Sequence, residues 1–259
     1  MKLSTIGDNC MDVYSATGQM FPGGNPVNVA VYTVRLGGEA SYTGAVGSDA
    51  CGSLLCQALR EKGVDVSHVH VLPGQTAATQ ISLRDRERIM GDYTEGVLLD
   101  YRPSEEDLDF LCQGDAVHTG LWSHMEHELP RLKRRVPVSF DFATQTDGPI
   151  LEQALPWVDY AFFSQEADTP ELRRFLQEVS RRGPRVSVAT LGSAGSLAWD
   201  GTRFRTMEAV PTNVVDTMGA GDSFIAGFLF RLCQGADLDT CMRAGAEKAA
   251  VTLQYMGAW

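Results

Sequence analysis

An acidic residue follows directly after a short glycine-rich segment near the end of the chain. Residues 216–223 are Asp-Thr-Met-Gly-Ala-Gly-Asp-Ser, and an apolar run typical of a helix begins within them. Glycines let backbone N–H groups approach a ligand closely, and the unpaired N–H groups of a helix start suit a phosphate. A carboxylate at Asp222 would repel that phosphate, but it has a use if it accepts the proton of a hydroxyl group that attacks phosphorus. The segment therefore indicates phosphoryl transfer. The structural alternative is a helix start that only packs closely.

Two polar segments in the first thirty residues could hold the attacking alcohol. Residues 23–28 are Gly-Gly-Asn-Pro-Val-Asn, and the amide of Asn28 can both donate to and accept from a sugar hydroxyl. Residues 7–12 are Gly-Asp-Asn-Cys-Met-Asp, with two acids that could bind paired hydroxyls. Taken alone, the first segment could equally be a turn with a helix cap, and the second a solvated loop.

The overall composition limits the classes of partner. The formal net charge of the 259 residues is −11 and no block of Lys and Arg is present, which argues against nucleic acid or an anionic membrane as the main partner. No apolar run approaches the ~18 residues of a transmembrane helix, and the first residues lack the apolar core of a signal peptide. Six scattered cysteines indicate reduced thiols. We therefore expect a cytoplasmic protein without a membrane partner.

The elements that position these residues follow an alternating pattern. From about residue 104, strands such as 136–142 and 157–163 alternate with helices such as 126–135 and 170–182. This order predicts an α/β fold with a mainly parallel sheet covered by helices on both faces. Segments 69–72, 79–83 and 88–93 have the alternation of strands without intervening helices, and predict a small antiparallel lid. Ligands of such sheets bind beyond the carboxyl ends of the strands.

The two glycine motifs together resemble a known family. Gly-Gly-Asn-x-x-Asn early and Asp-Thr-x-Gly-Ala-Gly-Asp late are the two signatures of the ribokinase-like (PfkB) carbohydrate kinases, and the resemblance covers essentially the whole chain. It implies a three-layer α/β/α fold in a single domain, residues 1–259, with lid strands from about 12–22 and 75–100. Segments 6–10, 91–97 and 257–259 are similar to the fructosamine 6-kinases of that family.

The resemblance implies a role for residues on both sides of the transfer point. Asp222 would be the general base, and the backbone of Gly219, Ala220 and Gly221 would form the anion hole. The sugar would be held by Asp12, Gly24 and Asn28. The nucleotide would contact Thr190, Gly192 and Gly195.

The resemblance to this family also implies which residues bind metal ions. Asp216 stands where many members bind a monovalent cation, with the carbonyl of Met218 as a further ligand. Many members also carry Asn-x-x-Glu to organise Mg²⁺ through water, but residues 164–168 of this chain are Ser-Gln-Glu-Ala-Asp. Glu166 or Asp168 could serve in its place, with Glu166 the preferred assignment.

The implied activity is ATP-dependent phosphorylation, with Mg²⁺ and possible K⁺ activation, of the C6 hydroxyl of a fructosamine such as fructoselysine. The alternatives are a ribokinase-like kinase for another sugar or a nucleoside, and a regulator that binds sugar or nucleotide without turnover. Arg84, Arg86 and Arg88 alternate on one strand. They could form a solvated lid face, or bind the carboxylate of an amino acid on the sugar. Lid strands in this family often pair between subunits, so a homodimer is also expected.

Overall fold

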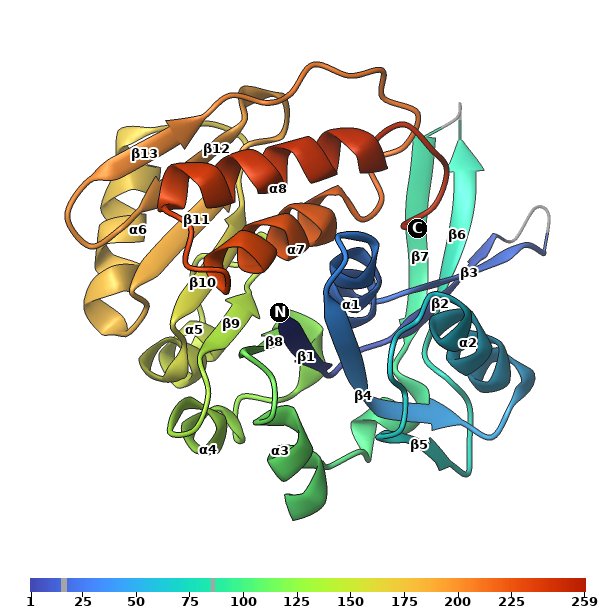
Figure 1. Cartoon of the computed structure of the whole chain (residues 1–259). Coiled ribbons are helices and arrows are strands. Elements are labelled where there is room, and N and C mark those ends of the chain that lie inside the picture. The colour runs from blue at the N-terminus through green and yellow to red at the C-terminus, as the bar shows by residue number, and fades with distance from the viewer. Residues whose placement is uncertain (15–17, 85–86) are drawn as a thin grey trace.

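A large twisted sheet forms the centre of the molecule in a computed structural model that describes residues 1–14, 18–84 and 87–259 (Figure 1). Its strand order is β13-β12-β11-β10-β9-β8-β1-β4-β5. All pairings from β11 to β5 are parallel, and β12 and β13 extend the sheet in antiparallel fashion. The strands are β1 (Lys2–Ile6), β4 (Glu39–Gly47), β5 (Val69–Leu72), β8 (Ala116–Gly120), β9 (Val138–Asp141), β10 (Tyr160–Ser164), β11 (Val186–Thr190), β12 (Ser196–Trp199) and β13 (Phe204–Met207).

Helices cover both faces of this sheet because its strands are apolar on both sides. On β10, Phe162 packs with one set of helices, whereas its neighbours Ala161 and Phe163 pack with the other. The first layer contains α1 (Asn25–Arg35), α2 (Ala50–Glu61), α7 (Ala220–Leu232) and α8 (Leu238–Thr252). The second contains α3 (Glu105–Leu111), α4 (Leu129–Lys133), α5 (Pro149–Ala154) and α6 (Pro170–Arg182). The predicted three-layer α/β/α architecture is therefore confirmed.

A second, four-stranded sheet lies beside α1 and α2, at the right of Figure 1. Its order is β3-β2-β6-β7, with strands β2 (Cys10–Tyr14), β3 (Met20–Gly23), β6 (Ala78–Arg84) and β7 (Glu87–Thr94). The outer pairings, β2–β3 and β6–β7, are antiparallel as predicted, and β2 and β6 pair in parallel at the centre. The predicted lid strands thus form one small sheet whose first strand leaves the carboxyl end of β1.

The structure corrects three details of the expected elements. Residues 69–72 form β5, which pairs in parallel with β4 in the large sheet and does not join the small one. The helix expected over residues 126–135 is confined to α4, since residues 121–123 form a 3₁₀ turn and the chain stays irregular before Leu129. Helix α5 lies in a stretch for which no element was predicted from the sequence. Further 3₁₀ turns span Gly96–Leu99, Leu155–Trp157 and Gly192–Ala194.

The hydrophobic core is divided between the two faces of the large sheet. The largest fully buried side chains include Tyr32, Tyr42, Phe140, Phe162 and Phe228. Among the described residues, none of the helices combines the length and the apolar composition that crossing a bilayer requires.

Candidate active site

The first turn of α7 places Asp222 at the carboxyl edge of the large sheet. Gly219 precedes this helix in the left-handed region, with φ of 72°, which a glycine adopts without strain. A Cβ atom at Gly219 would lie 3.1 Å from the backbone of Ala258 and from the hydroxyl of Tyr32. Backbone geometry and close packing therefore both favour glycine at the position where the helix starts.

Asn25, at the start of α1, joins two carboxylates from distant parts of the chain. Its Nδ2 atom donates to Asp222 Oδ1 at 2.8 Å and to Asp141 Oδ2 at 2.9 Å. Its backbone N–H donates to Oδ2 of Asp8, which follows strand β1, at 3.1 Å. The ends of β1 and β9 and the starts of α1 and α7 thus meet around one asparagine.

A buried histidine fixes the orientation of that asparagine. His118 Nε2 lies 2.9 Å from Asn25 Oδ1, and His118 Nδ1 lies 2.9 Å from Ser139 Oγ. Because the amide oxygen only accepts, Nε2 carries the hydrogen and Nδ1 accepts from Ser139. Burial lowers the pKa of His118 to about 3, so the ring is neutral at physiological pH. Both amide hydrogens of Asn25 are thereby directed at Asp141 and Asp222.

The carboxylates of this site hold their protons more tightly than usual. Burial raises the pKa of Asp222 to about 6, against the lowering effect of the hydrogen bonds from Asn28 and Asn25. The pKa of Asp141 is raised to about 7 by burial and then by the charge of Asp222. Burial also raises the pKa of Asp8, although Ser123 donates to it. A carboxylate with a pKa near 6 is largely ionised at neutral pH and is a stronger base than an exposed aspartate.

Asn28 lies one helical turn beyond Asn25 and contacts the same carboxylate. Its Nδ2 atom donates to Asp222 Oδ2 at 2.6 Å. The indole Nε1 of Trp259 donates to the Asn28 oxygen at 2.7 Å. The structure therefore brings one residue of each glycine motif, Asn28 and Asp222, into direct contact.

The other two predicted sugar residues, Asp12 and Gly24, lie on the side of the small sheet. Asp12, on β2, is buried, and its carboxylate lies against Gly23, where an added Cβ atom would be 3.4 Å from Oδ2. Gly24 has φ of 105°, and a Cβ atom there would lie 2.7 Å from Asn9 Cα. The loop after β1 and the start of α1 can therefore pack together only because residue 24 is glycine.

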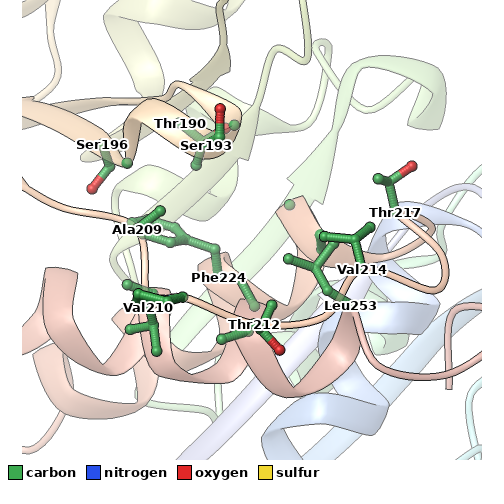
Figure 2. A pocket seen from close by; sticks show the side chains of 18 of the residues that line it. Thr190, Ser193, Ser196, Ala209, Val210, Thr212, Val214, Thr217, Phe224 and Leu253 are labelled. Carbon is green, nitrogen blue, oxygen red and sulfur yellow. The ribbon is translucent and has the colours of Figure 1, made fainter.

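A cavity of about 660 Å³ opens on the other side of the α7 start (Figure 2). Thr190 and Ser193 lie at one wall, and Val210, Val214 and Leu253 lie across from them. Two sets of predicted residues border this one cavity: Thr190, Gly192 and Gly195 of the expected nucleotide site, and Ala220 and Gly221 of the expected anion hole. Its volume and its mixture of an apolar wall with a few polar groups are typical of a small-molecule site.

The glycines around the cavity differ in what they do. A Cβ atom at Gly195 would lie 2.0 Å from the carbonyl oxygen of Met207, so this glycine is required by the backbone packing itself. Gly192 and Gly221 face open space within 4 Å, and Gly221 is exposed. Their backbones are therefore accessible to a ligand in the cavity.

The acids expected near metal ions lie in unlike surroundings. Asp168 is engaged by Arg173 through Nε at 2.7 Å and Nη2 at 2.6 Å, whereas Glu166 is exposed just beyond Ser164, which lines the cavity. This arrangement favours Glu166 over Asp168 as an acid that contacts Mg²⁺ through water. Asp216 is buried and accepts the backbone N–H groups of Met218 and Gly257, at 3.0 and 2.7 Å. Both carboxylate oxygens of Asp216 thus accept backbone N–H groups, and its role as a ligand of a monovalent cation stays a prediction.

The sequence motifs contain some, but not all, of the residues that meet around Asp222 in the structure. Asn25 and Asp8 lie inside the two early segments. Asp141 lies next to the end of the predicted strand 136–142, and an acid near a strand end is a signal that could have identified it. Trp259 lies in segment 257–259, which resembles the fructosamine 6-kinases, but only the fold brings His118 to Asn25 and Trp259 to Asn28. Arg86 lies outside the described residues, as do the side chains of Arg84 and Arg88, so their predicted role stays a prediction.

Comparison with known proteins identifies the class to which this site belongs. The model of the pfkB family carbohydrate kinases matches residues 5–129 and 159–259, so the chain belongs to that family. The solved ribokinase of Arabidopsis thaliana with ribose and ATP superposes with a TM-score of 0.91 at 24% identity, covering 99% of this chain and 93% of that one. The predicted ribokinase-like fold is therefore confirmed.

Relatives with higher sequence identity narrow the class of carbohydrate kinase to which this chain is similar. Fructoselysine 6-kinase of Escherichia coli is 45% identical over 99% of both chains. A fructosamine kinase of Bacillus subtilis is 35% identical over 100% of this chain and 93% of its own. The prediction of an ATP-dependent carbohydrate kinase, similar to the fructosamine kinases and acting on a small sugar, is confirmed by these matches.

Proposed function

We propose that this carbohydrate kinase transfers the γ-phosphoryl group of ATP to the C6 hydroxyl of a fructosamine such as fructoselysine. The observation that carries the proposal is the position of Asp222 at the start of α7. Ala220 and Gly221 face the large cavity, and Asp222 contacts Asn25 and Asn28 on the side of the small sheet. The similarity to fructoselysine 6-kinase supports the choice of substrate.

In the proposed reaction, Asp222 accepts the proton of the C6 hydroxyl as the new phosphorus–oxygen bond forms. Phosphoryl transfer depends mainly on positioning and on stabilising charge, so the base needs only the right place and an ionised state. The backbone at Gly219, Ala220 and Gly221, with the positive end of the α7 dipole, would stabilise the charge on the transferring group. The Ala220 N–H already donates to the Thr217 carbonyl at a long 3.3 Å, a weak bond that a phosphate oxygen can share.

We assign the sugar to the side of the small sheet. Asp12, Gly24 and Asn28 would hold it, because Asp12 and Asn28 offer acceptors and a donor to hydroxyl groups, and Gly24 lets the backbone approach. Closure of the small sheet as a lid over the sugar would keep water from competing for the phosphoryl group.

We assign the nucleotide to the cavity in Figure 2, with Thr190, Gly192 and Gly195 at its polar wall. Mg²⁺ bound with the nucleotide would neutralise phosphate charge, and Glu166 would orient one of its water ligands. K⁺ bound at Asp216 and the carbonyl of Met218 would stiffen the loop that leads into α7.

The remaining proposals concern the state of the protein in the cell. We expect a single domain over residues 1–259. We also expect a homodimer that pairs through the lid, and light scattering on the purified protein would test whether it is a dimer. We also expect a cytoplasmic location, where ATP is available; all six cysteines are free in the structure.

The decisive experiment is a coupled ADP-release assay across fructosamines, hexoses and nucleosides. The proposal requires the highest kcat/KM with a fructosamine, and a phosphomonoester at C6 by NMR of the product. A preference for a hexose or a nucleoside would refute the substrate, and sugar binding without ADP release would refute the activity.

A further inference from the structure

The indole of Trp259 lies against the proposed sugar site, far along the sequence from the residues that it contacts. Its Nε1–H donates to Asn28 Oδ1 at 2.7 Å, and the Asn28 amide in turn donates to Asp222 Oδ2 at 2.6 Å. The ring is partly buried between the cores beneath α1 and α7. Trp259 is therefore one hydrogen bond removed from the proposed base.

An indole N–H can only donate, and this property decides how the asparagine stands. With the indole beside it, the Asn28 side chain must present its oxygen to Trp259 and its NH₂ group to Asp222. The flipped amide would place two donors together at Trp259 and two acceptors together at Asp222, which leaves partly buried polar groups unsatisfied. One orientation of Asn28 is therefore strongly preferred while the indole is present.

We propose that Trp259 is a positioning residue for the phosphoryl transfer: its indole N–H fixes the Asn28 amide so that this amide holds Asp222 and presents its remaining hydrogen to the sugar. The inference rests on the proposed function of Asp222 and Asn28. It assigns no contact between Trp259 and the reacting atoms.

The segment that carries Trp259 is held at several points, as a positioning element must be. The N–H of Gly257 donates to Asp216 Oδ2 at 2.7 Å, and the carbonyl of Ala258 accepts the Tyr32 hydroxyl. Lys62 Nζ stands 5.8 Å from the centre of the Trp259 ring, a favourable cation–π distance. Asp216 also accepts the N–H of Met218. One carboxylate therefore ties the Trp259 segment to the loop that leads into α7.

The test variant is Trp259→Phe, which keeps an aromatic ring and removes the N–H. Trp259 does not border the nucleotide cavity, so KM for ATP should stay within about twofold, whereas kcat/KM for the sugar should fall roughly three- to tenfold. A mobile Asn28 amide donates less well to Asp222, which raises the pKa of that carboxyl. The acid limb of the kcat/KM profile should therefore move to higher pH.

The other groups around Asp222 are left in place by this substitution. They are the Asn25 amide from α1, the carboxylates of Asp8 after β1 and Asp141 on β9, and the Tyr32 hydroxyl. A shift of the acid limb of the kcat/KM profile in this variant would thus report a change at the Asn28 amide.

Two further variants separate positioning from packing. Trp199→Phe is the matched control, since Trp199 packs against Phe204 at the far edge of the large sheet, and its pH profile should equal that of the wild type. In an Asn28→Ala background, Trp259→Phe should cause no further loss. An unchanged acid limb in Trp259→Phe would overturn the proposal even if its melting temperature fell, and so would an equal loss in the Asn28→Ala background. If the wild type phosphorylates another sugar and no fructosamine, the proposed substrate fails and the same comparison is made with that sugar.

Discussion

Replacing Asp222 by asparagine removes the proposed base with the smallest change of shape. Loss of a general base lowers kcat by roughly 10²–10⁴, which corresponds to about 3–5 kcal/mol of transition-state stabilisation. The nucleotide cavity is bordered by Ala220 and Gly221 but not by Asp222, so binding of ATP should change little.

The same substitution has a structural cost that can be worked out from the contacts. Asn25 and Asn28 each donate an amide hydrogen to a different oxygen of Asp222. Asparagine at position 222 has one acceptor oxygen, so one of these donors then faces an NH₂ group. An unsatisfied donor costs about 1–3 kcal/mol, but the neutral amide also removes the cost of burying the charge that raises the pKa of Asp222. The free energy of unfolding at neutral pH should therefore fall by less than that amount.

The assay combines steady-state ADP release over about pH 5 to 8 with calorimetric titration of ATP and a urea melt. The wild-type kcat/KM should fall about tenfold for each pH unit below the pKa of Asp222, near 6, and this limb should disappear in Asp222→Asn. Asp237→Asn is the control, because Asp237 caps α8 on the surface and asparagine caps equally well. A folded Asp222→Asn enzyme that keeps more than about a tenth of its kcat would refute the general-base assignment.

Four further outcomes follow from the same contacts. Asp12→Ala should raise KM for the sugar and leave KM for ATP unchanged; a rise in KM for ATP alone would show that Asp12 was assigned to the wrong site. Gly221→Ala should fold normally, since a Cβ atom there meets open space, but should weaken ATP binding in calorimetry because the methyl group points at the cavity border. Glu166→Gln should raise the Mg²⁺ concentration for half-maximal activity. Asp168→Asn loses an ion pair with Arg173 but should leave that concentration unchanged. If only Asp168→Asn raised it, Asp168 and not Glu166 would be the acid near Mg²⁺. His118→Gln removes a group whose pKa is 6.5 when unfolded and about 3 when folded, so its contribution to stability is present above pH 6.5 and is lost as the pH falls towards 3. Between about pH 7 and pH 4.5 the wild type should therefore lose about 3 kcal/mol relative to this variant in urea melts, and a constant difference would contradict the neutral, buried state of the ring.

The alternating elements and the two glycine motifs were predictable because their signals are local. A strand that is apolar on both faces, a helix start with glycines and an acid, and a turn that requires positive φ are properties of a few neighbouring residues. The order of elements then implied a parallel sheet, and the carboxyl edge of such a sheet is where ligands bind. Asp222 and Asn28 could therefore be named before their contact was known.

Which strands pair with each other was harder to predict from the sequence. Residues 69–72 alternate like the strands of the small sheet, yet they pair with β4, because the hydrogen-bonding partner of a strand depends on where the chain returns and not on its own pattern. The parallel pairing of β2 with β6 has the same origin, since the two strands are separated by more than sixty residues, which include β3 of the small sheet, helices α1 and α2, and β4 and β5 of the large sheet.

The sequence by itself determined the family of this protein and the residues proposed for its chemistry: a carboxylate in a glycine-rich helix start, and polar residues suited to an alcohol. Only the tertiary structure decided how that carboxylate is tuned and held. The buried His118 orients Asn25, and Trp259 meets Asn28 from the other end of the chain. Both contacts join residues that are far apart in sequence, and the raised pKa of Asp222 depends on the protein that surrounds it. These properties arise from burial and long-range contact, which no local pattern encodes.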